Sequence, residues 1–315
     1  MTTKLETLPA PSKKAPAGKP TNSRRPGKSR ESRGSLAFSR QARSKALIKH
    51  AILILTGGVM IYPLLWMVVS SLRSNELIFR EPGLWLNSLE MGNYTDGWSA
   101  LTHPFGHYMI NSAVVVLGSI LGNLISCSMA AYAFARLQFT GQKIFFGIML
   151  LTIMLPFHVV IVPQYILFSQ IGWVNTFWPL IVPKLLATDA FFVFLMVQFI
   201  RGIPKELDEA ARIDGAGHPR IFLRVILPLM VPALATTTIF TFIWTWNDFF
   251  GALIYLTDPD MFTVPVALRA FVDSQSATSW GSLFAMSIVS LLPVFLVFLF
   301  GQRFLIKGIA TTGIK

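Results

Sequence analysis

The sequence predicts an all-α integral membrane protein with six transmembrane helices. Of its 315 residues, 53% are hydrophobic and only 13% are charged, and the mean hydropathy is +0.57. Soluble domains carry about 25% charged residues, so this composition is typical of a membrane protein. A helix needs roughly 20 apolar residues to cross the hydrocarbon core of a bilayer. Six segments meet this requirement: 47–71, 110–133, 144–168, 177–200, 227–256 and 282–304.

The segment before the first span differs from the rest of the chain. Residues 1–46 hold 12 Lys and Arg against two acids, and Pro, Gly and Ser are frequent. Such a segment lacks the apolar content to fold alone, so we predict a disordered basic cytoplasmic tail that contacts anionic membrane lipid. A nucleic-acid-binding arm is the alternative, but nothing else in the chain fits it, and no nucleic acid is predicted as a partner. Residues 47–315 then form one six-span transmembrane domain.

The orientation of the spans follows from the positions of the cations. Of the 27 Lys and Arg residues, 23 lie between the start of the tail and Lys49, in the 134–143 loop, in the 201–226 loop and in the C-terminal segment. Cytoplasmic loops are enriched in Lys and Arg. We therefore expect a multi-pass protein of the bacterial cytoplasmic membrane with both termini in the cytoplasm. The long segments 72–109 and 257–281 are then outside.

The second and fourth spans contain small and ionisable residues. Four small residues recur at four-residue spacing in the second span, which lets another helix approach closely. They are Gly118, Gly122, Ser126 and Ala130. The only cysteine, Cys127, lies among them and is expected to be a small buried side chain. In the fourth span, Lys184 and Asp189 are five residues apart, a spacing that is poor for an ion pair on one helix.

Polar residues in the third and fifth spans are candidates for a solute pathway, because polar groups inside a membrane are costly and often functional. The fifth span contains Trp244, Trp246, Asn247 and Asp248 in its outer half, and the third contains His158 and Gln164. Aromatic faces with amide and carboxylate groups are suited to sugar recognition. The alternatives are an aromatic belt with a snorkelling acid in the fifth span and ordinary helix packing in the third.

The charged loop 201–226 predicts two short helices joined by a bend. Pro204 suits a first helical turn, and Glu206, Asp208 and Glu209 follow where the helix dipole favours negative charge. Gly215 or Gly217 is expected to end this helix in the left-handed conformation, and a second helix starts at Pro219. Leu207, Ala210 and Ala211 are expected to share one face, a low-relief surface suited to a groove on another protein. A simple connector between two spans is the alternative.

The same loop resembles the cytoplasmic loop of ABC-importer permeases, whose pattern is E-A-A, three residues, G, nine residues and I-x-L-P. Here the pattern is Glu209, Ala210, Ala211, Gly215, Leu227 and Pro228, with Val225 in place of the Ile. The fuller string D-E-A-A-R-I-D-G-A is most similar to the carbohydrate branch of that family, in particular to the maltose-type six-span subunit. The resemblance extends over residues 47–315 and implies the fold of an ABC type I importer permease with a cytoplasmic coupling helix.

The resemblance implies that this helix docks into a cleft on a separate ATPase subunit. Glu209 would be the charged contact, Ala210, Ala211 and Gly215 would give the close fit and the bend, and Asp214, Leu227 and Pro228 complete the coupling motif. The C-terminal residues 308–315 would reach toward the interface of the ATPase pair. In the second outer segment, Asp273, Ser274, Gln275 and Ser276 fall where the similar subunit contacts its binding protein. A solvated loop is the alternative for these four residues.

The partners implied by the resemblance are a second homologous permease subunit, a pair of cytoplasmic ABC ATPase subunits and an extracytoplasmic solute-binding protein. The chain contains no G-x-x-x-x-G-K-[ST] motif, so ATP and magnesium are expected on the ATPase. No cofactor or metal is expected on this chain, and it is not expected to be an enzyme, because its spans lack metal-ligand spacing such as H-x-x-x-H.

The predicted function is the permease subunit of an ATP-driven importer for a sugar or oligosaccharide. Two alternatives remain. A self-sufficient secondary transporter or channel would need intramembrane ionisable relays. An importer of a phosphorylated polyol such as glycerol phosphate would share the loop, but no cluster of intramembrane arginines is present to bind phosphate.

Overall fold

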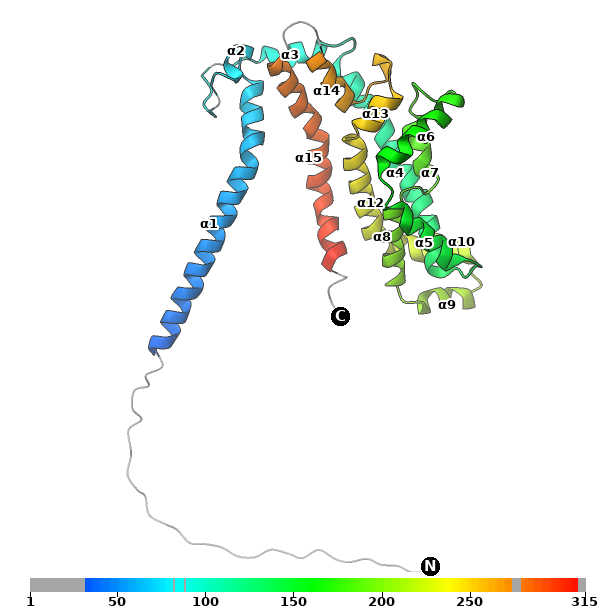
Figure 1. The fold of residues 1–315 in the computed structure, drawn as a ribbon. Coiled ribbons are helices and arrows are strands. Elements are labelled where there is room, and N and C mark those ends of the chain that lie inside the picture. Colours follow the sequence, from blue (N-terminus) through cyan, green and yellow to red (C-terminus); the bar gives the residue numbers. More distant parts are fainter. Residues whose placement is uncertain (1–31, 82, 88, 274–278, 311–315) are drawn as a thin grey trace, which may run out of the picture. The chain divides into compact units, whose positions relative to one another are not determined.

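The computed structural model describes residues 32–81, 83–87, 89–273 and 279–310, and every regular element in these ranges is helical (Figure 1). Its contacts divide the chain into two units, residues 1–60 and 61–315. Helix α1 (Ser32–Ser71) begins in the first unit and ends in the second. The predicted end of the tail at residue 46 therefore falls inside this helix. Residues 1–31 of the predicted tail lie outside the described residues.

The described residues contain four helical segments long and apolar enough to cross a membrane, or six if each of two bent helix pairs counts as one span. The four are Ala46–Ser71, Phe105–Arg136, Trp178–Arg201 and Trp280–Phe304. They correspond to the first, second, fourth and sixth predicted spans. The all-α multi-span fold predicted from hydropathy is confirmed, but the third and fifth spans differ from the prediction.

The third predicted span, 144–168, is not one continuous helix. Helices α5 (Gln142–Thr152) and α6 (Phe157–Gln170) meet at an angle of 100°. The break ends at Pro156. Proline lacks the N–H that would continue the helix, and its ring disfavours helical backbone at the preceding residue.

The fifth predicted span, 227–256, is also wrong in its bounds. Three short helical segments precede the long helix of this span: α10 (His218–Ile221), a π-helical turn (Phe222–Ile226) and α11 (Leu227–Leu229). Helix α12 (Val231–Trp246) continues at 74° to them and ends ten residues before the predicted limit. A separate helix α13 (Phe250–Tyr255) follows, because the carboxylate of Asp248 accepts a hydrogen bond from the N–H of Gly251 and stabilises a turn there.

Helix α4 (Phe105–Arg136) is the central helix of the second unit and packs against α7 (Trp178–Leu185), α8 (Ala190–Arg201) and α12. The small-residue stripe predicted for close packing is on this helix. A Cβ atom at Gly118 would lie 2.8 Å from Cδ1 of Ile181, and one at Gly122 would lie 3.0 Å from the carbonyl carbon of Lys184. The two glycines therefore let α7 approach the backbone of α4. Cys127 is fully buried, as predicted.

Two hydrophobic clusters lie toward opposite ends of α4. The cluster near Phe105 joins α4 to α12, α14 (Val264–Asp273) and α15 (Trp280–Ala310). Three short helical segments, α2 (Asn75–Ile78), α3 (Gly92–Ser99) and a 3-10 turn (Pro259–Met261), lie in the segments predicted to be outside. The other cluster joins α4 to α8 and α10 and carries α9 (Glu206–Ile213), which Figure 1 shows beside the end of α8.

Candidate functional site

Helix α9 forms the charged site predicted in the 201–226 loop. The helix begins at Glu206, and Lys205 is its N-cap residue. Pro204 therefore precedes the helix instead of lying in its first turn. Gly215 ends it in the left-handed conformation, with φ of +78°, which settles the choice between the two glycines. The N–H of Ala216 donates to the carbonyl oxygen of Ala211 at 2.9 Å, and the N–H of Gly215 donates to that of Arg212 at 2.9 Å. These two bonds form a Schellman motif, which fixes the bend after α9.

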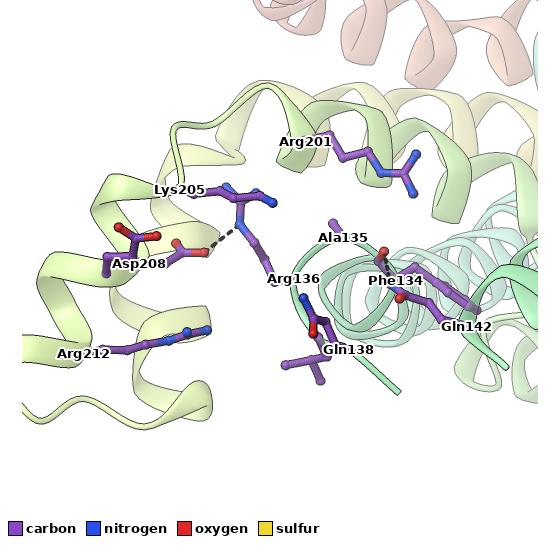
Figure 2. A pocket seen from close by; sticks show the side chains of 11 residues that line it. Phe134, Ala135, Arg136, Gln138, Gln142, Arg201, Lys205, Asp208 and Arg212 are labelled. Carbon is purple, nitrogen blue, oxygen red and sulfur yellow. Dashed lines mark hydrogen bonds and ion pairs between the residues drawn. The ribbon is translucent and has the colours of Figure 1, made fainter. Parts of the chain in front are cut away.

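Asp208 holds α9 to the end of the central helix. Its Oδ2 atom lies 2.7 Å from Nε of Arg136, the last residue of α4 (Figure 2). The side chains of Asp208 and Arg136 are 6% and 3% exposed, so the pair is buried. Arg136 also donates through Nη2 to the carbonyl oxygen of Ile203 at 2.7 Å. The sequence placed Asp208 correctly in the first turn but gave no signal for a partner 72 residues earlier.

The outward face of α9 differs from the predicted one. Ala211 packs against the hydrophobic cluster between α4 and α8, so it does not share a surface with Leu207 and Ala210. Leu207 is 42% exposed, and Ala210 and Glu209 are exposed. Ile213 extends this face and is 87% exposed. The free surface of α9 is therefore apolar and low in relief, with the Glu209 carboxylate beside it.

A polar hollow of about 380 Å³ lies between α9, the end of α8 and the loop after α4 (Figure 2). Arg201, Lys205 and Arg212 contribute cations, and Asp208 and Glu209 contribute carboxylates. The end of α4 and the following loop complete the lining with Phe134, Ala135, Arg136, Leu137, Gln138 and Gln142. The hollow can accept charged or hydrogen-bonding side chains from a partner protein.

The remaining residues of the predicted coupling motif lie around the two bends. Asp214 is the exposed residue at which α9 ends. Leu227 is half-buried and Pro228 is exposed, and both belong to α11, directly before the bend into α12. The motif thus extends from α9 to the helix that enters the membrane.

The four candidates in the fifth span do not form one cluster. Trp246 is 5% exposed, its Nε1–H donates to the carbonyl oxygen of Ser290 at 3.1 Å, and its ring stacks on Phe242. Trp244 is 50% exposed. Asn247 is exposed and its amide donates back to Ile243, while Asp248 forms the turn before α13. Trp246 therefore belongs to the packed interior, and Trp244 lies on a surface.

The two candidates on α6 face different surroundings. His158 is exposed, and its ring stacks on Phe250 with 5.1 Å between ring centres. This contact places α6 against α13. Gln164 is half-buried on the same helix. Their assignment to a solute pathway stays a prediction.

Lys184 and Asp189 form the ion pair that their spacing disfavoured. Nζ of Lys184 lies 3.0 Å from both carboxylate oxygens of Asp189. Residues five apart on a continuous helix point about 140° away from each other. Here α7 ends at Leu185, α8 begins at Ala190, and Ala187 has φ of +55°. A left-handed backbone at an alanine costs on the order of 1–3 kcal/mol. No Gly or Pro at that position predicts the break, but the break brings the two charges together.

The predicted binding-protein contact cannot be placed in full. Asp273 is the last residue of α14, but its side chain and residues Ser274, Gln275 and Ser276 lie outside the described residues. The same holds for residues 311–315, while the backbone of 308–310 continues α15. Both assignments stay predictions.

Comparison with known proteins identifies the family. Residues 122–310 match the family described as binding-protein-dependent transport system inner membrane component. The diacetylchitobiose uptake system permease protein NgcG of Streptomyces coelicolor is 33% identical over 82% of this chain and 85% of its own length. The arabinooligosaccharides transport system permease protein AraQ of Halalkalibacterium halodurans is 33% identical over 82% and 92%. The sn-glycerol-3-phosphate transport system permease protein UgpE of Pectobacterium atrosepticum is 30% identical over 84% and 95%.

The fold also matches a solved structure. One chain of the crystal structure of a bacterial ABC transporter involved in the import of the acidic polysaccharide alginate aligns with a TM-score of 0.75 at 21% identity, covering 84% of this chain and 98% of that chain. The predicted ABC-importer permease fold is confirmed. This chain belongs to the family of binding-protein-dependent transport system inner membrane components. It is a multi-pass inner-membrane permease component of an ABC importer and works with ATPase and binding-protein components.

Proposed function

We propose that this chain is the permease subunit of an importer that carries a neutral saccharide into the cytoplasm, with ATP hydrolysis on a separate pair of ATPase subunits. The observation that carries the proposal is the construction of α9. This short helix is fixed from behind by the buried Arg136–Asp208 pair and offers Leu207, Ala210 and Glu209 to a partner. A helix built only to connect two spans would need neither feature.

The Arg136–Asp208 pair gives a physical route from the ATPase to the membrane. Arg136 is the last residue of α4, which spans the membrane without a break and packs against α7, α8 and α12. Separating a buried ion pair leaves uncompensated charge, at a cost of about 3–5 kcal/mol. Moving α9 therefore costs less free energy if α4 moves with it than if the two helices separate. Movement of α4 then shifts the helices that surround it, as alternating access requires.

The other partners complete this mechanism. A second homologous permease would supply the remaining wall of the pathway, and an extracytoplasmic binding protein would deliver the solute at Asp273, Ser274, Gln275 and Ser276. ATP and magnesium would bind to the ATPase pair and not to this chain. Both termini would be cytoplasmic, and the basic tail would contact anionic lipid.

The saccharide assignment rests on relatives and on charge. The permease names of two relatives refer to diacetylchitobiose and arabinooligosaccharides, and that of a third refers to glycerol phosphate. Away from the ends of the six predicted spans, Lys184 is the only Lys or Arg. Both carboxylate oxygens of Asp189 already bind its ammonium group. A phosphorylated polyol would find no free cation inside these spans, whereas a neutral saccharide needs none.

The coupling role can be tested with Glu209→Lys. We expect the variant to reach normal membrane abundance but to lose uptake and to co-purify poorly with the ATPase. Glu90→Lys is the matched control, because Glu90 is exposed and lies in the segment predicted to be outside. Normal transport by Glu209→Lys would rule out the coupling role. Solute transport by the purified chain alone, without ATPase, would favour the secondary-transporter alternative.

A further inference from the structure

Two ionisable residues of the membrane domain, Lys184 and Asp189, form an ion pair. Lys184, Asp189 and Asp248 are the only Lys, Arg, Asp or Glu residues of the six predicted spans away from the span ends. Nζ of Lys184 lies 3.0 Å from both carboxylate oxygens of Asp189. Charges inside a membrane domain are expensive and usually mark a functional site.

The ion pair lies near the middle of its candidate membrane span. Asp189 is the twelfth of the 24 residues of the span Trp178–Arg201. The amide of Asn123 donates to Oδ2 of Asp189 at 2.7 Å and to Oγ1 of Thr241 at 3.1 Å. Asn123 is fully buried. The cluster therefore joins the central parts of α4, α12 and the break between α7 and α8.

This cluster is not sealed inside the chain. The side chains of Lys184 and Asp189 are 30% and 23% exposed. At this depth an exposed ion pair cannot face hydrocarbon without a large cost in free energy. The surface that carries it must therefore be covered by water, by a solute or by another polar protein surface.

Two exposed aromatic rings lie on the helices that adjoin the ion pair and its neighbour Thr241, namely α8 and α12. Phe191 is two residues after Asp189 and is 42% exposed, and Trp244 is one helical turn after Thr241 and is 50% exposed. The ring centres of Phe191 and Trp244 are 5.5 Å apart. Polar groups beside open aromatic faces are a general feature of sites that bind sugars, since the rings cover C–H faces and the polar groups bind hydroxyls.

We propose that Lys184, Asp189, Phe191 and Trp244 form the part of the solute-binding site that this subunit contributes at the middle of the membrane. The rings pack against the C–H faces of an uncharged saccharide, and the ion pair exchanges hydrogen bonds with its hydroxyl groups. Both carboxylate oxygens of Asp189 already bind the ammonium group of Lys184, so the site does not favour an anionic solute. This assignment rests on the proposed function, and Lys184, Asp189 and Phe191 lie outside the pathway set predicted from the sequence.

Thiol labelling tests whether this surface faces water. In a Cys127→Ala background, Phe191→Cys is compared with Leu121→Cys, within the assembled transporter. Leu121 is 58% exposed on α4, two residues from Asn123, and is thus at a similar depth on an apolar stripe. We expect a charged methanethiosulfonate reagent to modify Phe191→Cys at least about tenfold faster, because hydrocarbon excludes charged reagents. Equal rates at the two positions would overturn the proposal.

Uptake kinetics test whether a saccharide binds there. The probes are maltose, diacetylchitobiose and arabinotriose, supplied with the cognate binding protein. For the saccharide that is taken up, we expect Trp244→Ala to raise KM about tenfold, because it removes the ring that packs against the sugar. Trp244→Phe keeps an aromatic ring, so its KM is expected to stay near that of the unmodified protein. Trp178→Ala is the control, because Trp178 is 54% exposed and begins α7, more than one helical turn before Lys184. An unchanged KM in Trp244→Ala would overturn the site.

Different outcomes contradict the proposed function and the proposed binding site. The proposed function is contradicted if the unmodified chain does not co-purify with the ATPase, or if none of the three probes is taken up. Normal ATPase association and uptake, combined with slow labelling of Phe191→Cys and an unchanged KM in Trp244→Ala, contradict only the site. In that case the face carrying Lys184 and Asp189 contacts the second permease instead of the solute.

Discussion

Arg136 and Asp208 are the residues on which the position of α9 depends. Removing two charges from water costs several kcal/mol per ion, and their mutual attraction offsets this only in good geometry. The pair is therefore a poor source of net stability. Its value is geometric, since Nε of Arg136 and Oδ2 of Asp208 at 2.7 Å allow one arrangement of α9 at the end of α4.

This view predicts a non-additive result for substitutions of the pair. Asp208→Ala and Arg136→Ala each leave one buried charge without a partner, so each is expected to cost about 3–5 kcal/mol. Arg136→Met combined with Asp208→Leu is expected to recover most of the thermal stability measured by fluorescence-detected gel filtration. Uptake is expected to stay low in the double variant, because the apolar pair no longer fixes α9. Single variants as stable as the unmodified protein would contradict this role.

The sequence predicted these residues only in part. Glu206, Asp208 and Glu209 at the start of a helix follow from the dipole rule, and Gly215 at its end follows from the left-handed cap. The partner of Asp208 could not be predicted, because pairing between residues 72 positions apart depends on the packing of α4 and α9. For the same reason, the sequence placed Ala211 on the outer face, whereas the packing of α9 against α4 and α8 partly buries it.

At the scale of one element, α9 has two faces with different tasks. Ala210 is on the exposed face, and Ala211 packs against the cluster formed by α4 and α8. Adjacent alanines of the same motif therefore allow a matched experiment. A larger side chain at Ala210 meets only the partner, and one at Ala211 meets the interior of this chain.

We expect Ala210→Leu to reach normal membrane abundance and thermal stability but to bind the ATPase weakly. Ala211→Leu is expected to be destabilised by about 1–3 kcal/mol, because extra methylene groups strain a packed core. Thermal stability of the detergent-solubilised chain and ATPase pull-down measure the two effects separately. The face assignment is wrong if both variants lose stability to the same extent.

The breaks within the spans could not be predicted from hydropathy. The bend at Pro156 has a cause that is visible in the sequence, although hydropathy alone merged α5 and α6 into one span. The break between α7 and α8 has no such cause at Ala187, whose left-handed backbone is held by tertiary contacts: the hydroxyl of Ser126 on α4 donates to the carbonyl oxygen of Lys184 at 2.7 Å. Only the folded arrangement, in which Gly122 lies against Lys184, shows that break.

At the scale of the whole molecule, hydropathy predicted where the chain is apolar but not how the apolar segments meet. Segment length and composition are sums over residues, so four spans were located nearly in full. The contact of Asn123, Asp189 and Thr241 requires three spans to be placed in register, which no local pattern encodes. The candidate site around Lys184 and Asp189 could therefore be identified only from the structure, whereas the coupling motif could be predicted from the sequence.

The orientation of the chain leads to a prediction for the complete molecule. With 23 of 27 Lys and Arg in segments assigned to the cytoplasm, the opposite orientation would require translocation of the 201–226 loop with its five cations. It would also remove α9 from the compartment that contains ATP. Alkaline phosphatase fused after Lys315 is thus expected to be inactive, and the same enzyme fused after Glu90 is expected to be active. Green fluorescent protein at the same two positions serves as the control, since it is expected to fluoresce only after Lys315. Active phosphatase after Lys315 would place the C-terminus outside, and α9 could then not couple the bundle to an ATPase.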